Sequence, residues 1–179
     1  MSNVVPLGPR RDDDVDWAAR ILVLGRALTY ATLFISLALV FLPTQILEGS
    51  GVTRPAAIGF RAAVAVTVVV VGAALALWCV LTFALLGQGT PAPFDPPRRL
   101  VVRGPYRFVR NPMYLGAVLA LAGAALLYGS TALLFYAGAF LLMTHAFVVW
   151  YEEPTLRATF GADYDAYYRR VRRWRPRRT

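Results

Sequence analysis

The sequence predicts an all-α, polytopic membrane protein with about four transmembrane helices and a C-terminal cytosolic amphipathic helix. Hydrophobic residues make up 58% of the 179-residue chain, above the ~45–50% usual for soluble domains. They are gathered in blocks, and the stretch 62–86 contains no charged residue. That stretch exceeds the ~20 residues that a helix needs to span a bilayer. Most of the arginines lie in the segments between and after these blocks, which is typical of cytosolic loops.

Four apolar segments are expected to form helices. They run from 17 to 42, from 57 to 86, from 112 to 128, and from the end of a Gly129–Ser130 turn to 151. Pro43 is expected to end or kink the first helix, because proline lacks an N–H and clashes with the preceding turn. The glycines and prolines of 87–97 predict a long loop after the second segment. The third segment is short for a full crossing, and it forms a helical hairpin with the fourth.

The arginines predict the orientation of the chain in the membrane. All of them except Arg54 and Arg61 lie in the N-terminal part, in the loop between the second and third segments, or in the C-terminal tail. With four spans these three regions fall on one side, which the positive-inside rule makes cytosolic. We therefore expect both termini in the cytosol. The chain is read as one membrane domain, 1–179, divided into N-terminal spans (1–86) and a loop, hairpin and tail (87–179).

The positive charge has two further implications. A formal net charge of +9 would fit nucleic-acid binding, but the arginines flank apolar spans, so we expect the lipid bilayer as partner and no nucleic acid. The chain has no lysine and is rich in arginine and alanine, which suggests a bacterial, high-GC genome and hence the bacterial inner membrane. The oligomeric state cannot be predicted.

The tail carries an apolar stripe at helical spacing. Its members are Leu156, Phe160, Tyr164, Tyr167, Val171 and Trp174. Steps of three and four place them on one face of a helix, and arginines fill the other positions. This pattern is typical of helices that lie on a membrane surface.

The first motif whose residues could serve binding or catalysis is GPYRFVRNPMYLG, Gly104 to Gly116. Asn111 followed by Pro112 predicts a helix start with an asparagine cap, and the opening turn would offer unpaired N–H groups to an anion. Arg107 and Arg110 add charge beside it, and Gly116 would let a ligand or another helix approach closely. The alternative is a capped membrane helix whose arginines touch lipid phosphates.

The second motif is the adjacent pair Glu152–Glu153 at the end of the fourth segment. Ionisable residues at the membrane edge are functional candidates, and these two could bind an ammonium, ribose hydroxyls or the nearby arginines. His145 lies two helical turns earlier on the same face. It is either a ligand or a residue that is hydrogen-bonded to a neighbouring helix. The sequence contains no metal-binding cluster of plausible spacing, no P-loop and no serine elbow.

The order R-N-P-M-Y-x-G, hydrophobic hairpin, E-E and F-G-x-x-Y-x-x-Y resembles the isoprenylcysteine carboxyl methyltransferase and phospholipid N-methyltransferase superfamily. The resemblance covers Gly87 to Pro176. The first motif usually reads R-H-P-x-Y-x-G in that superfamily, so Asn111 stands where histidine is commoner. Asparagine keeps the hydrogen-bonding capacity but cannot act as a base near neutral pH.

The resemblance implies an S-adenosylmethionine-dependent methyltransferase acting on a lipophilic small molecule or lipid. It implies catalytic roles for Arg110, Asn111 and Glu153. The cofactor site it implies, with its flanking residues, comprises Tyr106, Arg107, Asn111, Pro112, Met113, Tyr114, Gly116, His145, Glu152, Glu153 and Tyr164. Whether the methyl acceptor is a carboxylate, an amine or a thiol stays open. The alternatives are a membrane sterol-type reductase using NADPH and a non-enzymatic scaffold or transporter subunit.

Overall fold

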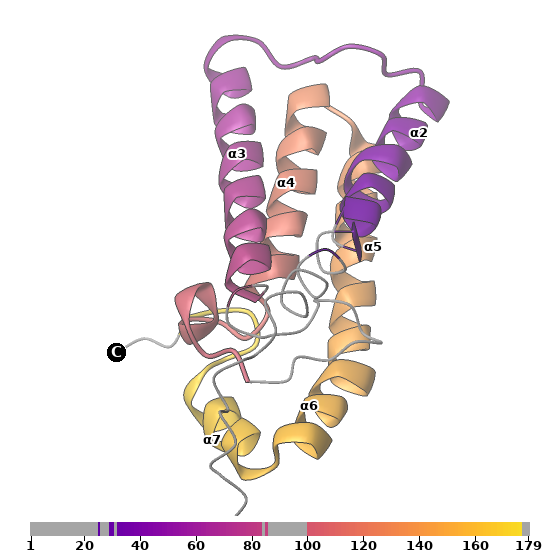
Figure 1. The fold of residues 1–179 in the computed structure, drawn as a ribbon. Coiled ribbons are helices and arrows are strands. Elements are labelled where there is room, and N and C mark those ends of the chain that lie inside the picture. The colour runs from indigo at the N-terminus through magenta and orange to yellow at the C-terminus, as the bar shows by residue number, and fades with distance from the viewer. Residues whose placement is uncertain (1–24, 26–28, 31, 84, 86–99, 177–179) are drawn as a thin grey trace, which may run out of the picture.

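The computed structural model describes residues 25, 29–30, 32–83, 85 and 100–176, and these form a helical protein (Figure 1). Three helical stretches are long and apolar enough to cross a membrane: Thr32–Gly49, Gly59–Thr82 and Thr131–Phe160. The shorter apolar helix Pro112–Tyr128 accompanies them. The prediction of an all-α polytopic membrane protein is therefore confirmed, including the short third segment.

The first stretch does not end at Pro43. A π-helical segment η1 (Ser36–Phe41) leads directly into α2 (Leu42–Gly49), whose first turn contains Pro43. In η1 the Leu42 N–H bonds to the carbonyl of Leu37, five residues back. Such a wider turn makes room for a proline inside a helix, which is why the expected break is absent. The predicted start of this segment at Trp17 lies outside the described residues.

Helix α3 (Gly59–Thr82) and helix α4 (Pro112–Tyr128) pack closely along their length, side by side in Figure 1. Glycines make this approach possible. A Cβ atom on Gly72 would lie 2.5 Å from the Ala120 nitrogen, and one on Gly116 would lie 2.7 Å from the Gly72 carbonyl oxygen. A Cβ atom on Gly123 would meet Val69 at 2.8 Å. Small residues of this kind let membrane helices touch backbone to backbone. We call this contact the α3–α4 seam.

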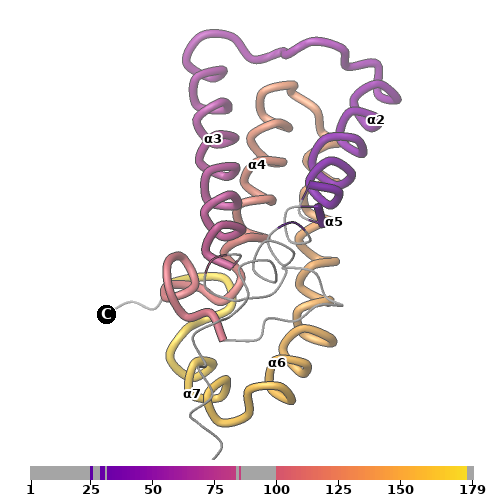
Figure 2. Tube along the Cα trace, viewed as in Figure 1, coloured from indigo at the N-terminus to yellow at the C-terminus, as the bar shows by residue number. Residues whose placement is uncertain are grey.

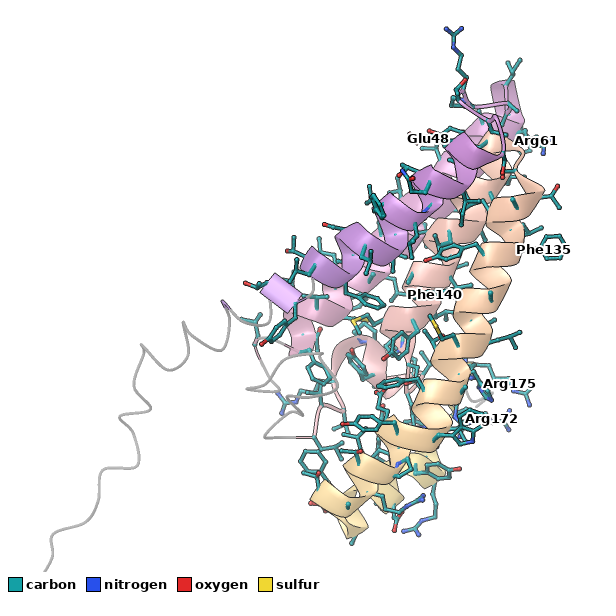
Figure 3. The ribbon with its side chains drawn as sticks, turned by 90° about the vertical axis from the view of Figure 1, so that its right-hand side faces the viewer. Glu48, Arg61, Phe135, Phe140, Arg172 and Arg175 are labelled. Carbon is teal, nitrogen blue, oxygen red and sulfur yellow. The ribbon has the colours of Figure 1, made fainter. Side chains whose placement is uncertain are left out.

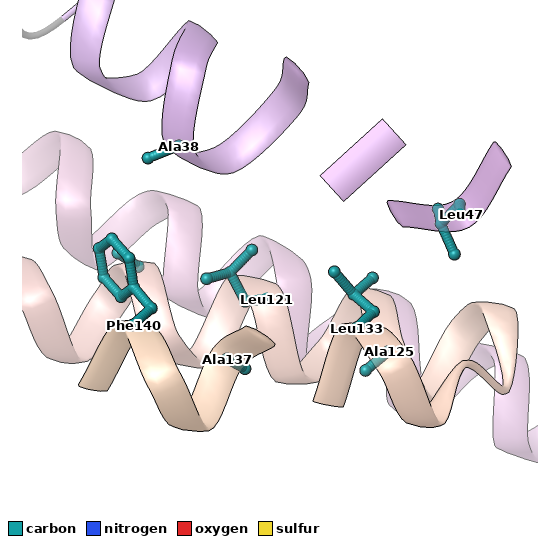
Figure 4. Close-up of a cluster of buried hydrophobic side chains, with 8 residues drawn as sticks. Ala38, Leu47, Leu121, Ala125, Leu133, Ala137 and Phe140 are labelled. Atoms are coloured by element: carbon teal, nitrogen blue, oxygen red, sulfur yellow. The ribbon is translucent and has the colours of Figure 1, made fainter. Parts of the chain in front are cut away.

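The predicted hairpin between the third and fourth segments is confirmed. Gly129 follows α4 in the left-handed conformation, with φ 64°, as expected for a helix C-terminus. Ser130 then caps α5 (Thr131–Phe147) by accepting a hydrogen bond from the Leu133 N–H at 3.2 Å. Leu121, Leu133 and Phe140 from the hairpin pack with Ala38 and Leu47 of the first stretch in one buried cluster (Figure 4).

The fourth stretch continues well past its predicted end at Tyr151. A π-helical segment η4 (Val148–Glu152) joins α5 to α6 (Glu153–Phe160), and Pro154 lies in the first turn of α6. The Glu153 N–H bonds to the carbonyl of Val148, again five residues back. The same wide turn therefore accommodates a proline here as at Pro43.

The tail forms two short helices instead of the single one that the apolar stripe predicts. Gly161 has φ 52° and separates α6 from α7 (Ala162–Arg170). Helix α7 ends where Val171 becomes extended, with φ −116° and ψ 130°. The chain then turns back toward the start of α4, as Figure 2 traces. Val171 and Trp174 are consequently outside any helix.

The two ends of the bundle differ in the residues they carry. Figure 3 shows Glu48 and Arg61 at one end, and Arg172 and Arg175 at the other. Between them the outer surface is apolar, with Phe135 75% and Leu142 72% exposed on α5. Exposed apolar side chains along spanning helices are suited to contact with lipid. The bundle therefore has the profile of a membrane protein with its polar side chains at its ends.

Candidate functional site

Three segments far apart in the sequence meet at the end of the bundle where α4 starts. They are the loop 109–111, the junction of η4 with α6, and the C-terminal segment 171–176. The Arg110 N–H donates to the Arg172 carbonyl at 2.9 Å, and the Asn111 N–H donates to the Arg173 carbonyl at 3.3 Å. Val109 and Arg172 form an isolated parallel bridge. Backbone contacts thus fix the tail against the start of α4.

Glu153 lies at the centre of this junction between two arginines. Its Oε1 accepts from Arg110 Nη2 at 2.8 Å and from Arg173 Nε at 2.8 Å, and its Oε2 accepts from Arg173 Nη2 at 2.7 Å. The Glu153 side chain is only 9% exposed. These hydrogen bonds raise the pKa of Arg173 above its ordinary value. Both carboxylate oxygens of Glu153 are therefore engaged within the protein.

Arg110 is the most connected residue of the site. Besides Glu153, its Nη1 donates to the carbonyls of Tyr168 and Val171 at 3.0 and 3.1 Å. Its guanidinium lies 3.9 Å from the centre of the Tyr168 ring, a favourable cation–π arrangement. Arg110 thus joins the start of α4 to α6 and to the end of α7.

Glu152 points to a different partner from its neighbour. Its Oε2 accepts a hydrogen bond from the Tyr114 hydroxyl at 3.2 Å. Within the described part of the chain, no arginine forms an ion pair with Glu152. The two adjacent carboxylates are therefore unequal: Glu153 is neutralised by arginines, whereas Glu152 has a phenol donor.

Among the residues that the structure describes, two buried donors at the start of α4 have no hydrogen-bond partner. They are Arg110 Nε and Asn111 Nδ2, and Asn111 is only 5% exposed. The predicted helix start is confirmed, because Asn111 occupies the N-cap position of α4, but its side chain does not make the expected cap hydrogen bond. An unmet buried donor costs ~1–3 kcal/mol, so this pair marks a place where an acceptor would be favoured.

Aromatic residues line the surroundings of this junction. The Tyr167 hydroxyl donates to the Tyr106 carbonyl at 2.7 Å, and Tyr164 is 1% exposed. Burial raises the pKa of Tyr164 and Tyr167 above the ordinary range, so both remain neutral donors. Tyr106 packs with Cys79 and Met113 in a small apolar cluster against α3.

The remaining predicted site residues are divided between this junction and other places. Pro112 is buried at the first position of α4. Arg107 is exposed and stacks on Phe108 at 4.6 Å. Gly116 was predicted to let either a ligand or another helix approach closely. It faces α3, so it allows the close approach of a helix. His145 accepts a hydrogen bond from the Trp174 indole N–H at Nδ1, at 2.9 Å.

Sequence reasoning missed two residues of the junction, Arg173 and Trp174. Arg173 stands in a run of five arginines between 169 and 175, and nothing in the sequence distinguishes it from Arg172 or Arg175. Trp174 fitted the helical stripe and was assigned to it. Among the described residues, no group of three His, Cys, Asp or Glu side chains is placed to hold a metal ion.

These features define a class of protein: a helical membrane protein with a polar, partly unsatisfied site at one end of its bundle. Comparison with protein families then identifies the family. The model of the phospholipid methyltransferase family matches residues 60–163, more than half of the chain, and the protein belongs to that family. It is accordingly a membrane methyltransferase. Comparison with curated proteins and with solved structures gives no significant match.

Proposed function

We propose that the protein transfers a methyl group from S-adenosylmethionine to a lipophilic acceptor at the cytosolic edge of a bacterial inner membrane, with both termini in the cytosol. The observation that carries the proposal is a pair of buried donors, Arg110 Nε and Asn111 Nδ2, for which the described residues supply no acceptor. They lie at the first turn of α4, where backbone N–H groups also lack helical partners.

The residues fit the charged groups of the cofactor. S-adenosylmethionine carries a carboxylate and an ammonium, and its sulfonium supplies the methyl group when it is bound. The start of α4, with the free donors of Arg110 and Asn111, suits the carboxylate. Glu152, which pairs with no arginine in the described part of the chain, suits the ammonium. Tyr106, Met113 and Tyr164 would supply apolar and aromatic walls near these groups.

The chain's own contribution to methyl transfer would be binding and orientation. Asn111 replaces the histidine that is commoner in this motif, and an amide does not take up a proton near neutral pH. Holding the reacting groups in line and excluding water can supply most of the rate effect without a protein base. In this proposal Arg110 and Asn111 touch the ligand, and Glu153 fixes Arg110.

The surroundings of the site favour a lipophilic acceptor. Trp150 and Tyr151, directly before Glu152, are 80% and 45% exposed. Exposed Trp and Tyr residues are enriched where membrane meets water, so Glu152 would lie at that depth. An acceptor anchored in the bilayer would reach this level from the side, between the hairpin and the earlier helices. Whether it presents a carboxylate, an amine or a thiol stays open.

The test is S-adenosylmethionine binding by calorimetry on detergent-purified protein, with Glu152→Gln as the variant. Loss of a charge-assisted hydrogen bond, worth ~1.5–3 kcal/mol, is expected to weaken affinity about ten- to hundredfold. Glu48→Gln is the matched control, because Glu48 is exposed at the opposite end of the bundle (Figure 3). Binding of NADPH instead would favour the reductase class, and binding of neither would favour a scaffold or transporter subunit.

A further inference from the structure

The segment after α7 is held in place by contacts of its first four residues, 171–174. We call this segment, residues 171–176, the strap. It leaves α7 at Val171 and runs beside the loop 109–111, with two backbone hydrogen bonds from Arg110 and Asn111. The Arg110 side chain also donates to the carbonyls of Tyr168 and Val171. The root of the strap is therefore tied to the start of α4.

Two strap side chains extend these contacts to other helices. Arg173 grips both oxygens of Glu153 at the start of α6, a bidentate arrangement that is strong and directional. Trp174 donates its indole N–H to His145 on α5. The strap thus joins the start of α4 to α5 and α6.

The other strap arginines differ from Arg173. Arg172 and Arg175 are exposed, and Figure 3 shows both at the outer surface of this end of the bundle. Among the described residues, no carboxylate forms an ion pair with either of them. Among the described strap arginines, Arg173 is therefore the one whose side chain is paired with a buried carboxylate.

The docked strap also accounts for the unequal glutamates. Arg173 and Arg110 together donate to both oxygens of Glu153, so this carboxylate is already paired with two cations. The same two backbone hydrogen bonds fix the residues that carry the unpartnered donors, Arg110 and Asn111. The orientation of those donors consequently depends on a segment that lies more than fifty residues later in the chain.

We propose that Arg173 and Trp174 are positioning residues, which dock the strap against the start of α4 and so aim the free donors of Arg110 and Asn111 at the ligand. The identity of that ligand rests on the proposed function; the docking of the strap does not. In this scheme Glu153 is the anchor of the strap, and Glu152 is the carboxylate that faces the ligand.

The test compares Arg173→Ala with Arg175→Ala, which removes the same side chain two residues away at an exposed position. Hydrogen–deuterium exchange of a peptic peptide spanning 108–113 reports the amides of Arg110 and Asn111, whose acceptors lie in the strap. We expect Arg173→Ala to expose both amides and to weaken S-adenosylmethionine binding at least tenfold. Arg175→Ala is expected to change neither. Trp174→Phe, which removes only the indole donor, is expected to have a smaller effect of the same kind.

Several results would overturn the proposal. Unchanged amide protection in Arg173→Ala would show that the strap does not depend on this residue. Exposed amides with unchanged affinity would show that the docked strap does not position the ligand site. If Arg173→Ala fails to fold, Arg173→Lys keeps the charge without the bidentate grip and is expected to give partial protection and intermediate affinity. Should the unaltered protein bind no S-adenosylmethionine, the proposed function fails, and the exchange data alone still decide whether Arg173 docks the strap.

Discussion

Helix α4 is held in two places by different forces. Along the α3–α4 seam, the helices pack closely at glycines. At its first turn, by contrast, α4 is held by a buried carboxylate between two arginines and by backbone bonds to the strap. Packing of small residues depends on shape, whereas buried ion pairs depend on every partner being present. The two places should therefore respond differently to substitution.

The largest expected effect is at the polar junction. Glu153→Ala leaves Arg110 and Arg173 without their carboxylate, and their side chains are only 8% and 23% exposed. Breaking a buried ion pair from one side costs ~3–5 kcal/mol, so the free energy of unfolding in detergent should fall by about that amount.

The control for this prediction is Asp165→Ala. Asp165 pairs with Arg157 at the same distance of 2.8 Å, but the two side chains are 42% and 50% exposed. Exposed pairs contribute little, and no measurable change is expected. Equal decreases in the free energy of unfolding in the two variants would contradict the view that burial makes the ion pairs of the junction more stabilising than an exposed pair.

An intermediate effect is expected at the α3–α4 seam. The Cβ of Gly116→Ala would lie 2.7 Å from the Gly72 carbonyl oxygen and 2.8 Å from the Ala76 nitrogen, so the helices must move apart. Overpacking of this kind costs ~1–3 kcal/mol, measurable as a lower unfolding temperature. Gly138→Ala on α5 is the control, because a Cβ atom there meets nothing within 4 Å. Wild-type stability in Gly116→Ala would mean that the seam is looser than described.

The same contrast explains how far the sequence predicts this structure. The apolar segments, the hairpin turn at Gly129–Ser130 and the short α4 follow from hydrophobicity and turn chemistry, which act over a few residues. The helix does not end at Pro43, one of the two outcomes expected there, since a π-helical turn before this proline accommodates it, as another does before Pro154, and no local pattern predicts such turns. The helical spacing of the apolar stripe predicts one continuous helix through Gly161, although a glycine is itself a sign of a helix break.

The polar junction could be predicted only in part. Arg110, Asn111, Tyr114, Glu152 and Glu153 were selected from the sequence, and the structure brings these residues together. Arg173 and Trp174 were not, because their partners Glu153 and His145 lie 20 and 29 residues away and on other helices. Contacts between residues this far apart in the sequence depend on how the chain folds back. The arginine run itself does not indicate which arginine is buried.

The smallest expected effect is that of Tyr114→Phe. Tyr114 lies in the first turn of α4 and donates to Glu152 at 3.2 Å. Phenylalanine keeps the ring and its packing but removes this donor, so the free energy of unfolding should fall by only about 1 kcal/mol. If Glu152 faces the ligand, its carboxylate also loses orientation, and S-adenosylmethionine affinity should fall about fivefold. Tyr136→Phe is the matched control, since it removes a hydroxyl on α5 that donates to the Ala38 carbonyl of η1 at 2.8 Å. Its stability loss should be similar and its cofactor affinity unchanged. An equal loss of S-adenosylmethionine affinity in both variants would mean that Tyr114 acts only through the stability of the bundle. Glu152 would then not need the Tyr114 hydroxyl to bind the ligand.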